Sequence, residues 1–408
     1  MHPEETLDRI KKFINRTPVQ LNKFLSRKYG AEIYLKREDL QVVRSYKLRG
    51  AFNKIISLSE QDRNRGVVCA SAGNHAQGVA YSCREFNIKA VIFMPVPTPK
   101  QKINQTRMFG EDSIEIVLVG DTFDECQEHA LAYTKEHNLV FIPPFDDYDV
   151  IEGQSTVGVE ILEDIPQPDI IILPIGGGGL ASGVGYYLKS KLPDVRIFGI
   201  EPEGAASMAA AMTEGMPVTL NRINGFVDGA AAKRVGEKTF AMCKTVLDDI
   251  KLIPEGKVCS AILELYNRDA IVAEPAGALS IAALDYYRSE IKGKRVVCVI
   301  SGGNNDIDRM GEIKELSLLY EGLKHYFIVL FPQRPGALKQ FVNQVLGPEY
   351  DITRFDFIKK TQREFGPALV GIELRKVSDY EVIIHRMKES NFDYIEINED
   401  KTLFEYLI

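Results

Sequence analysis

The sequence predicts an α/β protein in which two lobes, each a doubly wound parallel sheet, precede a small C-terminal domain. Three observations lead to this fold class. From about residue 66 to 142, short β-rich runs alternate with helical patterns, which is typical of βαβ units. A second alternating series begins near Gly153 and contains fully apolar strands of the kind buried on both faces. From His325 the order becomes βαββαβ, a ferredoxin-like arrangement.

The first lobe is predicted from four strands and the helices between them. The expected strands are VVCAS, AVIFM, IEIVLVG and NLVFI, and the expected helices are NHAQGVAYSCREF, TPKQKINQTRMFG and DTFDECQEHALAYTKEH. The second lobe is expected to contain the strands DIIILPI, RIFGI and RVVCVI. We expect both lobes within residues 1–320, with the small lobe inserted at about 52–150 and the functional site in the cleft between them.

The C-terminal domain is expected to cover residues 325–408. Its predicted elements are, in order, strand HYFIVLF, helix RPGALKQFVNQVL, strands DITRFDFIKK and ALVGIEL, helix DYEVIIHRMKES and strand YIEIN. The junction near 318–324 is short, so we expect a docked domain rather than a loosely tethered one.

Composition excludes several classes of function. The 408 residues are 45% hydrophobic and 26% charged, and no apolar run approaches the length of about 20 that a membrane span needs. The N-terminus is charged and lacks the apolar core of a signal peptide, which favours a cytoplasmic protein. A net charge of −7 gives no basic footprint for nucleic acid.

Cysteine and histidine spacing gives no metal or disulfide signature. The six cysteines are scattered without a CxxC pair, so we expect small buried thiols. The six histidines do not cluster, and no HExxH motif exists in the chain.

A run of four glycines forms the first of three candidate binding turns. GGGGLASG, at 176–183, follows an apolar strand and opens a helix. Glycines at a helix N-terminus expose backbone N–H groups and the positive end of the helix dipole, an arrangement that binds phosphate. The alternative is a flexible strand-to-helix connector. Phosphate binding is favoured because four glycines cost backbone entropy unless something approaches the backbone closely.

Two further polar turns follow predicted strands. SAGNHAQG, at 71–78, places hydrogen-bond donors at a helix N-terminus, where a carboxylate fits. We expect its His75 to be a capping or packing residue rather than a general base. SGGNND, at 301–306, offers Ser301 as a neutral hydroxyl at the end of a strand, with a plain turn as the alternative. In SYKLRGAF, Lys47 taken alone is a solvated lysine near a helix start or a buried amine with chemistry to perform.

Together these motifs carry a family resemblance. SYKLRGA, SAGNHAQG, GGGGL, EPAGA (274–278) and SGGNND occur in the order and approximate spacing of the fold-type II pyridoxal-phosphate enzymes. Residues 1–320 resemble the threonine dehydratase (threonine ammonia-lyase) family. The C-terminal unit, with RPGAL after its first strand, resembles the ACT-like regulatory domain of the biosynthetic members, in a form with one such domain.

The resemblance implies pyridoxal 5'-phosphate as the cofactor and a role for each motif. Lys47 would be the Schiff-base lysine and the catalytic base, and Ser301 would face the pyridine nitrogen. Asn74 would hydrogen-bond the 3-hydroxyl of the cofactor. The residues expected around the cofactor phosphate are Gly176, Gly177, Gly178, Gly179 and Leu180, and those around the substrate carboxylate are Ser71, Ala72, Gly73, Asn74 and His75.

The implied reaction is β-elimination of L-threonine to 2-oxobutanoate and ammonia, the first step of isoleucine biosynthesis. Isoleucine and valine are the implied effectors, and the implied assembly is a homodimer or homotetramer. Some relatives bind a divalent cation after an EP pair, but EPEGAAS has Ser207 where an aspartate would help. We therefore assign no metal ligand, and a cation site to which Glu201 and the Ala205 carbonyl contribute stays open.

Three alternatives stay open. A serine-directed relative, such as serine dehydratase or serine racemase, shares the lysine, asparagine and glycine motifs; the C-terminal unit favours threonine. A catalytically silent amino-acid sensor would keep the fold but has no need for Lys47. The C-terminal unit itself is either a regulatory module or a purely structural dimerisation module.

Overall fold

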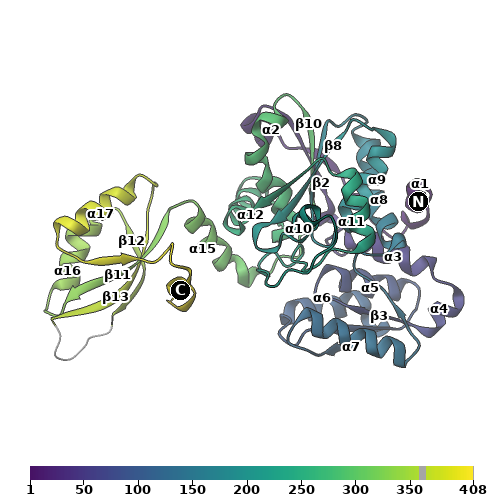
Figure 1. The fold of residues 1–408 in the computed structure, drawn as a ribbon, viewed down its shortest axis with the longest axis horizontal. Coiled ribbons are helices and arrows are strands. Elements are labelled where there is room, and N and C mark those ends of the chain that lie inside the picture. Colours follow the sequence, from purple (N-terminus) through teal and green to yellow (C-terminus); the bar gives the residue numbers. More distant parts are fainter. Residues whose placement is uncertain (358–363, 408) are drawn as a thin grey trace. The chain divides into compact units, whose positions relative to one another are not determined.

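The computed structural model describes residues 1–357 and 364–407, which form three β-sheets (Figure 1). The chain divides into two compact units, Met1–Asp308 and Arg309–Ile408. The first unit contains two of the sheets and the second contains the third. The predicted fold class of two α/β lobes and a C-terminal ferredoxin-like domain is confirmed.

The larger sheet of the first unit has the strand order β1-β2-β10-β7-β8-β9. Its strands are β1 (Val19–Leu21), β2 (Glu32–Arg37), β7 (Ile170–Pro174), β8 (Arg196–Pro202), β9 (Asp249–Ile253) and β10 (Arg295–Ile300). β1 pairs antiparallel with β2, and all other neighbours are parallel. The predicted apolar strands form its centre. The sequence patterns did not predict three of its strands: β1 and β2 from the N-terminus, and β9 at the opposite edge.

Helices cover both faces of the larger sheet. Leu180, Val184 and Leu188 recur every four residues and place α9 against the same core as α8 and α11. α13 packs on β7, β8 and β10. The helices of this lobe are α1 (Pro3–Ile10), α2 (Lys23–Tyr29), α8 (Tyr148–Asp164), α9 (Gly179–Lys191), α10 (Ser207–Glu214), α11 (Glu237–Val246), α12 (Glu255–Asp269), α13 (Pro275–Ala282) and α14 (Arg288–Ile291).

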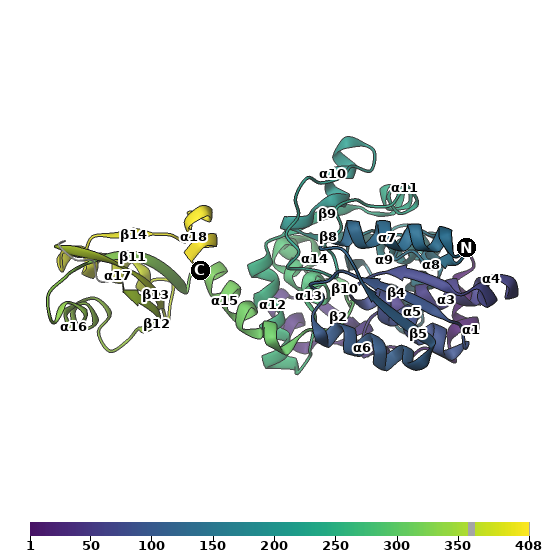
Figure 2. The same cartoon turned by 90° about the horizontal axis from the view of Figure 1, so that it is seen from below.

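The smaller sheet is parallel throughout, with the order β5-β4-β3-β6. Its elements are α3 (Lys47–Ser57), α4 (Glu60–Arg65), β3 (Val67–Ala70), α5 (Asn74–Glu85), β4 (Ala90–Met94), α6 (Lys100–Gly110), β5 (Ile114–Leu118), α7 (Phe123–Glu136) and β6 (Val140–Phe141). In β3, Val67 and Cys69 join the core under α3, α5 and α6, whereas Val68 and Ala70 join the core under α7. Figure 2 shows α6 and α7 on opposite sides of this sheet.

The second unit contains an antiparallel sheet in the order β12-β13-β11-β14, which is the strand order of a ferredoxin-like fold. Its elements are α15 (Met310–Tyr320), β11 (Lys324–Pro332), α16 (Ala337–Phe341), β12 (Asp351–Phe357), β13 (Phe365–Glu373), α17 (Asp379–Glu389), β14 (Tyr394–Glu396) and α18 (Lys401–Leu407). Phe341 of α16 and Met387 of α17 pack on Phe327, Val329 and Phe331 of β11. The last residues of the predicted strand DITRFDFIKK, 358–360, lie outside the described residues.

Interactions of α15 group it with the second unit rather than the first. Tyr326 in β11 donates from its hydroxyl to Glu315 at 2.5 Å, and Lys324 forms an ion pair with the same carboxylate. The compact second unit therefore begins at Arg309, before the predicted boundary at 320–325. The second unit thus includes α15, whereas the predicted limits of 1–320 and 325–408 assign this helix to the first domain; those functional limits stay a prediction.

Two further properties of the described residues bear on the sequence analysis. All six cysteines are free and buried, as their apolar surroundings predicted. None of the helices in the described part of the chain combines the length and apolar character that a membrane crossing requires.

Candidate active site

Each polar turn follows the carboxyl end of a parallel strand, two in the larger sheet and one in the smaller, and side-chain contacts join the turns of the two lobes. Ser71 follows β3, Gly176 comes shortly after β7, and Ser301 follows β10. Ser45 forms a bridge to Gly302, and the Tyr46 N–H donates to the Ser301 carbonyl at 3.1 Å. These contacts place the SYKLRGA segment directly beside the SGGNND turn, although the two are far apart in sequence.

Lys47 lies at the first position of α3 and is partly buried. Its Nζ donates to the Pro144 carbonyl at 2.8 Å and lies 5.6 Å from the centre of the Tyr46 ring and 6.0 Å from that of Phe145. Burial lowers the pKa of Lys47 to about 8, and the charge of Glu274 opposes this shift. Only about a tenth of this amine is unprotonated at pH 7, but this fraction is far larger than at the ordinary lysine pKa of 10.5, so an ordinary solvated lysine does not describe its environment.

The four glycines are required by close packing as well as by backbone conformation. Gly178 has φ of 90°, and a Cβ on Gly177 would lie 2.2 Å from Cδ1 of Phe145. Thr239 donates from its hydroxyl to the Gly177 carbonyl at 2.7 Å, which orients this peptide. Among the described residues, the N–H groups from Gly176 to Leu180 donate to no acceptor. This turn at the start of α9 is therefore free to bind an anion.

Asn74, at the start of α5, joins the second turn to two other motifs. Its Nδ2 donates to Oε1 of Glu274 at 2.7 Å, and its Oδ1 accepts from Nδ2 of Asn304 at 2.7 Å. Asn304 Nδ2 also lies 3.0 Å from Oε1 of Gln77. Motifs from residues 74, 274 and 304 thus form one polar network.

Glu274 is the residue of this network to which the sequence analysis assigned no role. Only 5% of its surface is exposed, and burial, together with the negative charge of Asp228, raises its pKa to about 7. The EPAGA motif contained the residue, but its proximity to Asn74 depends on tertiary packing. Phe145 and Pro144 were also missed, because a short PPF segment carries no local signal of a binding site.

The Ser71–His75 turn is compact. The Gly73 N–H donates to the Ser71 hydroxyl at 3.2 Å, and Gly73 precedes the first residue of α5. His75 is buried, and its Nε2 donates to the Ile142 carbonyl at 2.9 Å. Burial and the neighbouring Lys47 charge lower the pKa of His75 to about 3, so the imidazole is neutral. His75 therefore packs as expected and has too low a basicity for a general base.

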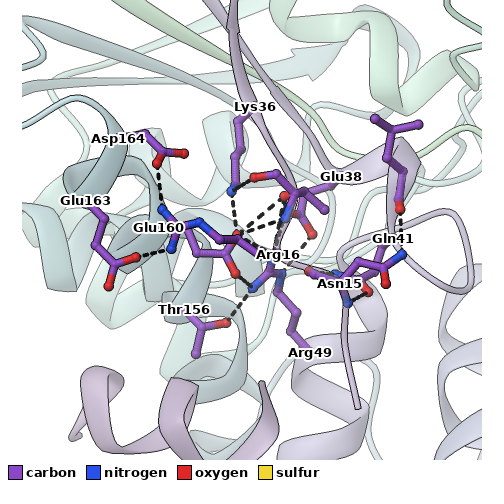
Figure 3. Close-up of polar contacts among 12 residues, drawn as sticks. Asn15, Arg16, Lys36, Glu38, Gln41, Arg49, Thr156, Glu160, Glu163 and Asp164 are labelled. Atoms are coloured by element: carbon purple, nitrogen blue, oxygen red, sulfur yellow. Dashed lines mark hydrogen bonds and ion pairs between the residues drawn. The ribbon is translucent and has the colours of Figure 1, made fainter. Parts of the chain in front are cut away.

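A buried ion cluster lies beside the first turn of α3, two residues after Lys47 (Figure 3). Arg49 donates to both oxygens of Glu38 at 2.8 Å and to both oxygens of Glu160 at 2.8–2.9 Å. Lys36 donates to Glu160 at 2.5 Å, and all four side chains are at most 1% exposed. Two positive and two negative groups balance here, so the cluster ties α3 to β2 and α8 without a net buried charge.

Comparison with known proteins explains why these motifs occur together. A family described as "Pyridoxal-phosphate dependent enzyme" matches residues 10–302, and one described as "C-terminal regulatory domain of Threonine dehydratase" matches residues 315–407. The biosynthetic L-threonine dehydratase IlvA of Bacillus subtilis (strain 168) is 56% identical over 400 residues, which span 98% of this chain and 95% of that protein. The chain belongs to the biosynthetic threonine dehydratase family.

Other members and relatives of the threonine dehydratase family agree with this. IlvA of Halalkalibacterium halodurans is 54% identical over 98% of this chain and 96% of that protein. The processed form of threonine deaminase isoform 2 from Solanum lycopersicum superposes with a TM-score of 0.73 at 40% identity, over 78% of this chain and 93% of that one. Maize serine racemase superposes with a TM-score of 0.72 at 30% identity, over 78% and 97%.

The residues of this threonine dehydratase family member fit pyridoxal phosphate. The unbonded N–H groups from Gly176 to Leu180 match a phosphate, and the partly buried amine of Lys47 matches an aldehyde. Asn74 retains one N–H beyond those used in its network. The site therefore contains unbonded backbone donors that fit a phosphate, an amine that fits an aldehyde and a free amide N–H that fits a ring oxygen.

Glu201, which the sequence analysis named as a potential metal ligand, lies at the N-terminus of α10. The Glu201 carboxylate accepts the backbone N–H groups of Met208 and Ala209 at 2.7 and 2.8 Å, and so caps α10. Burial raises the pKa of Glu201 to about 7. Within the described residues, no group of three His, Cys, Asp or Glu side chains is arranged to hold a metal ion.

Proposed function

We propose that this chain deaminates L-threonine to 2-oxobutanoate and ammonia with pyridoxal 5'-phosphate, as the first step of isoleucine biosynthesis. The observation that carries the proposal is the Lys47 amine of lowered pKa beside the unbonded tetraglycine turn, in a chain 56% identical to an L-threonine dehydratase. Bound pyridoxal phosphate supplies an electron sink for the bond changes at the substrate.

Each motif has a proposed task in this reaction. Lys47 would hold the cofactor through its amine, and the unprotonated amine would act as the general base toward the Cα proton of the substrate. The N–H groups from Gly176 to Leu180 hold the phosphate, and the turn from Ser71 to His75 holds the substrate carboxylate. Asn74 donates to the 3-oxygen of the cofactor.

Ser301 is proposed to face the pyridine nitrogen. A neutral hydroxyl stabilises negative charge at Cα less than a charged partner would, which favours prompt loss of the β-hydroxyl over racemisation or transamination. Ser301 is buried beside the Lys47 segment, which supports a role within the site.

The second unit is proposed to bind isoleucine as an inhibitor, with valine opposing it. Such control requires different effector affinities in two global states, with a coupling of typically ~1–3 kcal/mol. We further propose a cytoplasmic location and a homodimeric or homotetrameric assembly. The structural dimerisation module remains the alternative, and insensitivity of the intact enzyme to isoleucine would favour it.

The test is 2-oxobutanoate formation by the full-length chain from threonine, with and without isoleucine, beside pyruvate formation from serine. We expect turnover of threonine, inhibition by isoleucine, and loss of both the visible cofactor band and activity in Lys47→Ala. Preference for serine would support the serine-directed alternative. We consider this alternative because the chain is 30% identical to maize serine racemase. A colourless wild-type protein that binds amino acids without turnover would support the sensor alternative.

A further inference from the structure

The side-chain amide of Asn74 is held at both ends. Nδ2 donates to Glu274 and Oδ1 accepts from Asn304, each at 2.7 Å. An ionised carboxylate only accepts and an amide nitrogen only donates, so these two partners allow a single orientation of the amide. In that orientation one N–H of Nδ2 is left for a ligand, and the carbonyl oxygen is already occupied.

The first unit is shaped to hold the Glu274 carboxylate at this point. Its backbone N–H donates to the Gly302 carbonyl at 3.1 Å, and a Cβ on Gly302 would lie 2.3 Å from Oε1 of Glu274. Gly302 therefore leaves room for the carboxylate at the end of β10. Burial disfavours the charged carboxylate, and the hydrogen bonds from Asn74 and the Asn304 N–H oppose this effect, so Glu274 is ionised as an acceptor for Asn74 above its pKa of about 7.

We propose that Glu274 is a positioning residue, which fixes the Asn74 amide so that its remaining N–H can only donate to the ring oxygen of the cofactor. The inference rests on the proposed role of Asn74 in cofactor binding. Without the Glu274 acceptor only the contact with Asn304 distinguishes the two orientations of the amide, and the flipped orientation, now more populated, turns a carbonyl oxygen toward the cofactor oxygen. Two acceptors facing each other weaken binding and shift the absorption of the bound cofactor.

A double-mutant cycle in the full-length chain separates this indirect role from a direct one. The variants are Glu274→Ala, Asn74→Ala and the double variant, with exposed Glu203→Ala as a matched control. Each is stripped of cofactor, and the Kd for added pyridoxal phosphate and the visible absorption maximum are measured. Circular dichroism of each cofactor-free variant reports its fold.

We expect Glu274→Ala to weaken cofactor binding about tenfold and to shift the absorption maximum. In the Asn74→Ala background the same substitution is expected to change neither quantity, and Glu203→Ala is expected to match the wild type. Multiplicative effects of the two substitutions would overturn the inference, because Glu274 would then act independently, for example through its charge on Lys47. A wild-type Kd in Glu274→Ala would overturn it as well.

Two controls keep the outcome interpretable. If Glu274→Ala does not fold, Glu274→Gln replaces it; this variant is close in volume, and its smaller shift must equally vanish in the Asn74→Ala background. Failure of the wild type to bind pyridoxal phosphate, or to release 2-oxobutanoate from threonine, contradicts the proposed function. A wild type that does both while Glu274→Ala behaves identically contradicts only the positioning role.

Discussion

Glu160→Gln tests the buried ion cluster, and Glu163→Gln, one turn further along α8, is its matched control. Glu160 is 1% exposed and accepts from Arg49 and Lys36, whereas Glu163 is 48% exposed and pairs with Arg16 at the surface (Figure 3). The substitution is the same and the helix is the same. Only burial and the number of charged partners differ.

The expected magnitudes follow from the charges left behind. Glu160→Gln leaves the cluster with one uncompensated positive charge, and breaking a buried pair in this way costs about 3–5 kcal/mol. An exposed pair contributes about 0–1 kcal/mol. These free energies convert to a change in Tm through an unfolding entropy of about 2.1 cal/mol/K per residue over the roughly 308 residues of the first unit. The expected Tm loss is about 5–8 °C for Glu160→Gln and at most about 2 °C for Glu163→Gln.

The assay is calorimetric unfolding of both cofactor-free variants at one scan rate, with hydrogen exchange of peptides from β12 and β13 as an internal reference in the other unit. Burial alone would raise the pKa of Glu160, but Arg49 and Lys36 hold it below its ordinary value of 4.5. The stability contributed by this carboxylate is therefore complete above pH 4.5 and is lost as the pH falls through the lowered pKa. Equal Tm losses for the two variants at pH 7 would refute the reasoning.

Three further predictions concern the site itself. Uptake of pyridoxal phosphate by the cofactor-free chain should become faster as the pH rises around the Lys47 pKa of about 8, because only the unprotonated amine reacts. An increase in this rate centred near the ordinary lysine pKa of 10.5 would contradict the environment described for Lys47. Ser301→Asp should increase racemised or transaminated product relative to 2-oxobutanoate, and an unchanged product ratio at a lower rate would count against the role of the neutral hydroxyl. Gly177→Ala should weaken cofactor binding at least about tenfold, because its Cβ would lie 2.2 Å from Phe145. The control Gly225→Ala, whose Cβ meets no atom within 4 Å, should bind the cofactor normally. Equal Kd values for the two variants would show that the glycine turn adapts to the added methyl group.

Much of the fold was predictable because its signals are local. The apolar runs that became β7, β8 and β10 are strands buried on both faces, and their composition alone identifies them. β1 and β2 escaped prediction: β1 has only three residues, and the polar residues of β2 hide its pattern, notably Lys36, which is fully buried through its ion pair with Glu160.

Local patterns in the chain identified a lysine at a helix start, a tetraglycine turn and two polar turns that follow strands. The parallel order of β7 and β10 explains why the turns after them lie at one edge of the larger sheet. The turn after β3 belongs to the smaller sheet, and its contacts with the other motifs depend on how the two lobes pack. Tertiary packing was needed to show that Glu274 faces Asn74, that Phe145 fills the space beside Gly177, and that Arg49 is buried between Glu38 and Glu160. Glu274 and Asn74, like Arg49 and Glu160, are more than a hundred positions apart in the sequence. The closer pairs join different segments of the chain, so no local pattern encodes any of these contacts.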